Sequence, residues 1–299
     1  MTGTPIWRTS IVTLSFQYPY LLHALFSLSA LHLVFFHSKD NSVLAKRFCN
    51  LATLHYAKCI SLYRTELQTL TVQNAAACWA CASVLALHAW TRPDGQGADL
   101  FFSTADTEVP WYKIHRGGVE VLQQAFQWAE EGALCDMIRP LMVLKLDFVP
   151  IPEASHLSQL RDDIVKLSTI AECWISMPIS DQHTLSEALQ TLRHIFTLMP
   201  QFSTQAEKPL EPRVSSWIAT LSWTTLFPRK FCQMIDERLP QALVVVAIYC
   251  ILLKRIDRKE LWWIKGKAES LFGAIEKDLK GERWDVWLQW PREEIYRES

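Results

Sequence analysis

The sequence predicts an all-α protein, and three observations lead to this prediction. Apolar residues recur at spacings of three and four along several long segments, as they do on one face of a helix. No segment shows the sustained alternation of apolar and polar residues that marks a half-buried strand. Residues 242–253 carry no charged side chain, which is typical of a helix buried on every side. Because this run is shorter than the roughly 20 residues that cross a bilayer, we expect it to be the central helix of one large helical domain.

Composition narrows the classes of function. The 299 residues include 30 basic and 31 acidic side chains, and this balance argues against broad nucleic-acid binding, which needs a basic surface. Only 20% of residues are charged, 49% are hydrophobic and 13 are tryptophans, which indicates a lined cavity or an interface. Most of the 8 cysteines lie in apolar helical patterns, and no secretory leader precedes them. We therefore expect reduced thiols and an intracellular protein, cytoplasmic or nuclear.

The first half of the chain predicts four helices. Pro19 suits the first turn of a helix that runs through Phe36, and its histidines and serines argue against a transmembrane segment. Residues 40–42 offer caps for the second helix, and residues 74–90 form an alanine-rich third. Trp111 to Ala129 is the fourth, entered through a glycine pair at 117 and 118. The apolar positions expected to define the second helix are Leu44, Phe48, Leu51, Tyr56, Cys59 and Leu62.

The second half predicts an amphipathic helix over 157–174 and a further helix that leads to the central one. Thr184 and Glu187 have the spacing of a capping box, in which hydroxyl and carboxylate satisfy each other's backbone N–H groups. We expect that helix to stop at Pro200, followed by a linker over 201–212. Residues 1–17 are expected to be an N-terminal segment, and residues 18–299 the helical domain.

No recognisable catalytic motif appears in the chain. Cys78 and Cys81 form a CxxC in the middle of a predicted helix, where a structural role is expected rather than redox chemistry. The nine histidines show no metal-ligand spacing, and glycine-rich phosphate loops and nucleophile elbows are absent. The sequence predicts no cofactor and no metal, and it leaves any catalytic residue unknown.

Aromatic residues gather toward the C-terminal end. Each one is most simply explained by packing, but together with the uncharged central helix they favour a cavity for an apolar ligand. His88 and Trp90 could supply polar contacts at one end of such a ligand. The predicted ligand-binding residues are Trp217, Trp223, Phe227, Tyr249, Leu253, Trp263, His88 and Trp90.

Several short motifs resemble one known family. Residues 19–25 (PYLLHAL) and 28–33 (LSALHL) resemble the opening of the regulatory domain in fungal binuclear zinc-cluster transcription factors of the sterol uptake control type. His55-Tyr56-Ala57 is similar to a recurring step of that family, and Arg116-Gly117-Gly118 to its RG turn. Residues 239–242, Trp262-Trp263 and residues 287–291 are similar to its closing section.

The resemblance implies an all-helical domain that encloses a sterol or other lipid and forms a homodimer. Family members begin with a six-cysteine zinc cluster that binds DNA, and nothing in this sequence matches it. No direct nucleic-acid binding is therefore expected.

Two classes of function stay open. One is a stand-alone pocket protein of fungal secondary metabolism, a cofactor-independent cyclase or isomerase that folds a terpenoid or polyketide into a reactive conformer. The missing zinc cluster favours this first class. The other is the sterol- or lipid-sensing domain of a regulator without its own DNA-binding part.

Overall fold

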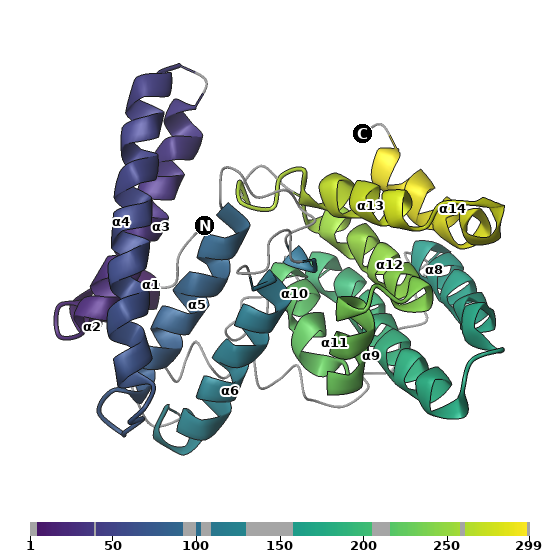
Figure 1. Cartoon of the computed structure of the whole chain (residues 1–299), viewed down its shortest axis with the longest axis horizontal. Coiled ribbons are helices and arrows are strands. Elements are labelled where there is room, and N and C mark those ends of the chain that lie inside the picture. Colours follow the sequence, from purple (N-terminus) through teal and green to yellow (C-terminus); the bar gives the residue numbers. More distant parts are fainter. Residues whose placement is uncertain are drawn as a thin grey trace. The chain divides into compact units, whose positions relative to one another are not determined.

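The structure is a computed structural model and describes residues 5–38, 40–91, 100–102, 109–129, 158–204, 216–257 and 261–297. Every regular element in these ranges is a helix, so the predicted all-α class is confirmed (Figure 1). Backbone contacts divide the chain into two compact units. Unit 1 comprises residues 1–95, 105–139 and 259–263, and unit 2 comprises residues 96–104, 140–258 and 264–299. The division into a segment 1–17 and a domain 18–299 stays a prediction.

The described part of unit 1 contains an antiparallel pair of long helices, two further long helices and two short N-terminal ones. In chain order its described helices are α1 (Pro5–Arg8), α2 (Ser10–Ser15), α3 (Pro19–His37), α4 (Ser42–Glu66), α5 (Ala75–Thr91) and α6 (Trp111–Ala129). Pro19 begins α3 as expected, and the Asn41 side chain caps α4 by accepting a hydrogen bond of 2.9 Å from the backbone N–H of Leu44. Asn74 closes the turn before α5 by accepting from the N–H of Thr71 at 2.7 Å.

The buried stripe of α4 differs from the predicted one. Cys59 is buried as expected, but Leu51 and Leu62 are 39% and 42% exposed, whereas Ala45 and Ala52 are buried. Small residues at this spacing let α3 approach α4 closely, so packing selects a face that hydrophobicity alone does not mark. Leu44, Phe48 and Tyr56 are half-buried at the edges of this face.

Unit 2 surrounds one apolar helix. Its described helices are α8 (Ser158–Thr169), the 3-10 helix η2 (Ile170–Trp174), α9 (Ile179–Thr204), α10 (Ser216–Leu226), α11 (Arg229–Asp236), α12 (Pro240–Ile256), α13 (Lys267–Asp278) and α14 (Glu282–Tyr296). Every residue from Ala242 to Leu253 in α12 is at most 1% exposed. The expected buried central helix is confirmed, and α13 and α14 pack along it within unit 2 (Figure 1).

A buried ion network ties α8 and α14 to the end of α12. The guanidinium of Arg255 donates to both oxygens of Asp163, at 2.6 and 2.9 Å, and to Glu294 at 3.1 Å. The side chains of Asp163 and Arg255 are only 6% and 20% exposed. Because Asp163 is desolvated, loss of Arg255 would leave its charge uncompensated, whereas loss of Asp163 would leave Arg255 with Glu294 as its remaining partner.

The predicted start and end of α9 are wrong. Thr184 lies inside the helix, and its hydroxyl donates to the carbonyl of Ser180 at 2.9 Å instead of capping an N-terminus. Pro178, just before Ile179, offers the earlier start, and the helix continues past Pro200 to Thr204. Residues 205–212 of the expected linker lie outside the described residues.

Among the described residues, α3 alone has by itself the length and hydropathy of a membrane-crossing helix. One third of its most apolar window is buried against the rest of the fold. Helices α11 and α12 meet the same criterion only as a pair, and they are bent by 103° where they join. The described residues therefore contain no clear membrane span.

Candidate functional site

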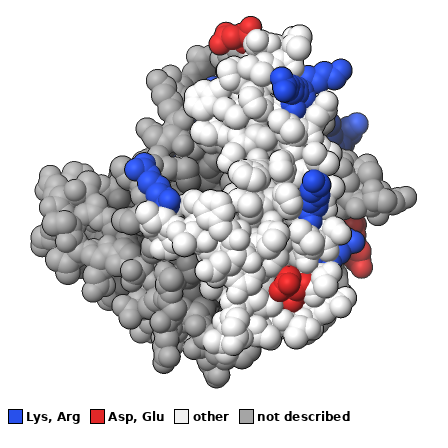
Figure 2. All heavy atoms as spheres, turned by 90° about the vertical axis from the view of Figure 1, so that its left-hand side faces the viewer, with Lys and Arg blue, Asp and Glu red and all other residues white. Residues whose placement is uncertain are grey.

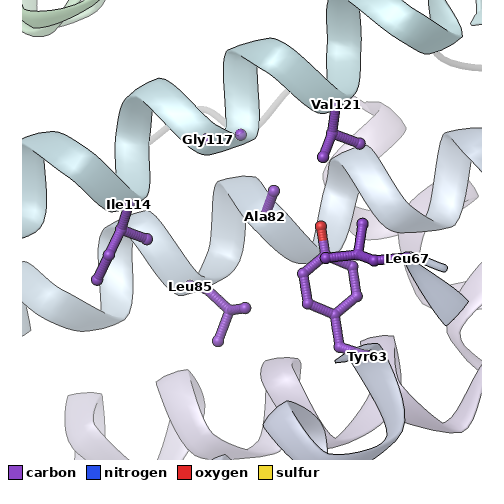
Figure 3. Close-up of a pocket in the computed structure, with 8 residues that line it drawn as sticks. Tyr63, Leu67, Ala82, Leu85, Ile114, Gly117 and Val121 are labelled. Carbon is purple, nitrogen blue, oxygen red and sulfur yellow. The ribbon is translucent and has the colours of Figure 1, made fainter. Parts of the chain in front are cut away.

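A pocket of about 190 Å³ opens in unit 1 between α4, α5 and α6 (Figure 3). Helix α4 and the residue after it supply one wall, α5 the floor and α6 the opposite wall. Each helix presents a side chain or a glycine at helical spacing, so the lining follows from regular structure. The lining residues are Tyr63, Leu67, Ala82, Leu85, Ile114, Gly117, Gly118 and Val121.

The two glycines of α6 have different roles in this wall. A Cβ added at Gly118 would lie 3.2 Å from the Cβ of Ala82, so this glycine lets α6 approach α5 closely. A Cβ added at Gly117 would meet no atom within 4 Å, so this glycine leaves space open. Both lie inside α6 rather than before a helix or in a turn, which corrects the expectation from the sequence.

The single polar side chain of the lining is already bonded within the fold. The hydroxyl of Tyr63 donates to the carbonyl of Cys78 at 3.0 Å, and burial raises the pKa of Tyr63 far above its usual range. The phenol is therefore a neutral wall group. A pocket with this lining favours an apolar ligand and offers no side chain for acid–base chemistry.

The volume limits the size of the ligand. An apolar cavity of about 150 Å³ binds benzene, and pockets for drug-sized molecules span about 300–1,000 Å³. The volume of the pocket in unit 1, about 190 Å³, is close to that of the benzene-binding cavity. It suits a molecule of about one ring, and a whole sterol would not fit inside it.

The cysteines beside the pocket are buried thiols. Sγ of Cys81 lies 3.5 Å from Sγ of Cys59, and Sγ of Cys78 lies 3.4 Å from the hydroxyl of Tyr20. Burial raises the pKa of Cys78 and Cys81, which keeps both protonated at neutral pH. The CxxC thus has the structural surroundings that the sequence predicts.

Three of the predicted ligand-binding residues form one aromatic cluster in unit 2. The rings of Trp223 and Tyr249 stack at 4.6 Å, and Phe227 meets Trp223 at 4.9 Å. The indole N–H of Trp223 donates to the carbonyl of Ala188 at 3.1 Å. The hydroxyl of Tyr249 is buried with no hydrogen-bond partner among the described residues. Leu253 is buried one turn beyond Tyr249 on α12.

The other predicted residues lie elsewhere. Trp217 is half-buried on α10 in unit 2. In unit 1 the ring of Trp90 meets those of Trp111 and Trp263 at 4.8 and 5.5 Å, and His88 stacks on Tyr56 at 4.3 Å.

Within this tryptophan cluster, the indole N–H groups of Trp90 and Trp111 have no partner among the described residues. They are donors that an acceptor oxygen could satisfy.

None of the eight predicted residues lines the pocket between α4, α5 and α6, and their role as ligand contacts stays a prediction. The sequence did single out the glycine pair and the small residues of α5. The sequence did not show that the glycine pair of α6 packs against the small residues of α5, because a long connection separates the two helices. A search for small residues on two successive helices would have found the pocket.

Comparison with known proteins gives one informative match. The chain is 22% identical over 311 aligned positions to a Zn(2)-C6 fungal-type transcription factor of Gibberella zeae. This match supports a relation to that family. The alignment covers 97% of the chain but only 57% of that relative's length. No protein-family model matches the chain, and no solved structure matches it.

The similarity favours the regulatory alternative. It extends over nearly the whole chain, as the resemblance in the sequence implies. The cyclase hypothesis gains no support from the comparison or from the lining of the pocket. The findings therefore support an all-α fold and a similarity to fungal transcription factors.

Proposed function

We propose that this chain is the ligand-responsive regulatory domain of a fungal regulator. The observation that carries the proposal is the match to a Zn(2)-C6 fungal-type transcription factor over 97% of the chain. The all-α fold and the balanced charge are in keeping with a regulatory rather than a DNA-reading part.

The proposed effector is an apolar molecule of about one ring, bound between α4, α5 and α6. Because this pocket is lined by three helices, occupancy would stabilise their packing relative to the empty state. A ligand changes output only if it binds one arrangement of the helices better than another. The close approach of α6 to α5 at Gly118 is the contact through which we expect such a difference to arise.

A larger lipid would need a different site. The aromatic cluster around Trp223 and Tyr249 is the proposed place for it, with the unpartnered Tyr249 hydroxyl as its polar contact. A nuclear or cytoplasmic location and a homodimer are further parts of the proposal, based on the same resemblance.

The test is a fusion of the chain to an unrelated DNA-binding domain in a fungal host that carries a matching reporter. We expect reporter output to differ from that of the DNA-binding domain alone and to respond to small apolar metabolites. Gly117→Leu, which fills the pocket, should abolish the response, and Gly117→Ala should retain it. Output equal to that of the DNA-binding domain alone, under all additions, would refute the regulatory proposal.

A further inference from the structure

We infer that the outer face of the α3–α4 pair is a docking surface for an amphipathic helix with acidic flanks, supplied by another protein. The inference does not rest on the proposed function. The outward residues of α3 are spaced alternately four and three residues apart, as in the seam of a coiled coil. These residues are Leu22, Phe26, Ser29, Leu33 and Phe36.

The seam is open to solvent. Phe26, Leu33 and Phe36 are 47%, 37% and 59% exposed, although α3 already buries its opposite side in unit 1. Apolar side chains of this size are seldom left exposed in a row on a helix. The second face of α3 therefore has the character of an interface.

Helix α4 extends this face. The ring of Phe26 lies 5.2 Å from that of His55, which places His55 at the junction of the two helices. Leu51, Lys58 and Leu62 are four, three and seven residues from His55, so they lie on the same side of α4. All three are exposed. Leu51 and Leu62 add apolar surface beside the seam, and Lys58 adds a positive charge.

Charge selects the partner. Helix α3 contains no Asp, Glu, Lys or Arg, and the exposed charges on the side of α4 that carries Leu51 and Leu62 are Arg47 and Lys58. Lys46 and Arg64 lie on another side of α4, and Asp40 is exposed in the connection between the two helices. The one acidic residue of α4, Glu66, lies at the C-terminal end and accepts a hydrogen bond from Asn74 at 3.0 Å. Figure 2 shows a broad uncharged area on this side of the molecule, with more Lys and Arg than Asp and Glu at its edges.

The face and its charges favour one occupant. A second copy would bring Arg47 and Lys58 toward basic residues of its own, which is unfavourable. A lipid surface would accept the same apolar stripe and basic residues, because helices that lie on membranes also have apolar residues three and four apart, and the vesicle experiment below tests this alternative. An acidic amphipathic helix matches the stripe between two helices as well as the basic residues beside it, as in helix-in-groove recognition.

The experiment uses the full chain and two fluorescent synthetic helices of about three heptads, with leucine at the a and d positions. One carries glutamate at the e and g positions and the other lysine. We expect the glutamate probe to bind at least about tenfold more tightly at low salt, with the difference shrinking as salt is added. Fluorescence anisotropy gives both affinities.

Variants locate the binding and keep the test independent of folding. Phe26→Asp and Leu33→Asp should abolish binding of the glutamate probe, and Val286→Asp, at an exposed position of α14, should leave it unchanged. The double variant Arg47→Glu, Lys58→Glu should reverse the preference between the probes. Circular dichroism confirms that each variant is folded.

Other results overturn the inference. Equal affinity for the two probes, or no binding at all, contradicts it. So does a dimer of this chain that Leu33→Asp dissociates, which would assign the face to a second copy. Sedimentation with anionic phosphatidylserine vesicles that depends on Phe26, without probe binding, would assign it to a membrane surface.

Discussion

Substituting alanine at each glycine of the pair in α6 tests the geometry of the pocket directly. Alanine inside a helix is more stable than glycine by about 0.5–1 kcal/mol. At Gly117 the new methyl group meets no atom within 4 Å, so Gly117→Ala should gain that amount. At Gly118 it would lie 3.2 Å from the Cβ of Ala82, and overpacking of this kind costs about 1–3 kcal/mol. Gly118→Ala should therefore lose up to about 2 kcal/mol net.

The assay is thermal unfolding followed by circular dichroism, combined with hydrogen exchange of peptides from α5 and α6. A change of 1 kcal/mol corresponds to about 2–4 °C in Tm for a domain of 150–250 residues. Hydrogen exchange assigns the effect to unit 1, where local opening of the two helices is measured separately from the rest. If Gly118→Ala proves as stable as Gly117→Ala, the close approach of α6 to α5 is refuted. If Gly117→Ala is destabilised, the open space at Gly117 is refuted.

Three further predictions concern ion pairing, pH and an orphan hydroxyl. Asp163→Ala leaves the buried Arg255 with Glu294 as its remaining partner and should cost about 1.5–3 kcal/mol by urea denaturation. Ala at the exposed neighbour Asp162 should change stability by less than about 0.5 kcal/mol, and equal effects would contradict the network. Burial, with Arg116 nearby, lowers the pKa of His115 from 6.5 to about 4. Between these two pH values the unfolded chain binds a proton that the folded chain excludes. The free energy of unfolding should therefore fall by about 2–3 kcal/mol as the pH drops from 6.5 to 4. His115→Phe should flatten that dependence, measured as Tm against pH, and an unchanged slope would assign it to other groups. Tyr249→Phe removes a buried hydroxyl without a partner and should raise stability by about 1 kcal/mol in the same thermal assay; a loss of stability would show that the hydroxyl is bonded.

The sequence predicted helices well where a local signal sufficed. Trp111 to Ala129 matches α6 at both ends, because proline and apolar periodicity mark the start and the face of that helix. Composition alone was enough to predict that the uncharged run in α12 is buried. The start of α9 was missed because Thr184 and Glu187 mimic a cap at a position where the helix already exists.

The site was harder to predict because it depends on contacts between helices. The sequence shows the glycine pair and the alanine-rich helix, but not that Gly118 faces Ala82, where an added methyl group would lie 3.2 Å from the Cβ of Ala82. Trp223 donates its indole N–H to a carbonyl within the core, and the role of the tryptophans as ligand contacts stays a prediction. The buried role of Asp163 was missed because its ion-pair partner, Arg255, lies far away in the sequence.

Native mass spectrometry of the chain purified from a fungal host tests the central claim, a regulatory domain that holds a small apolar effector. We predict one unmodified molecule of about one ring per chain, released intact on denaturation and absent from Gly117→Leu. A chain that instead consumes an apolar precursor from host extract and releases an isomer of equal mass would contradict the regulatory account and establish the cyclase hypothesis.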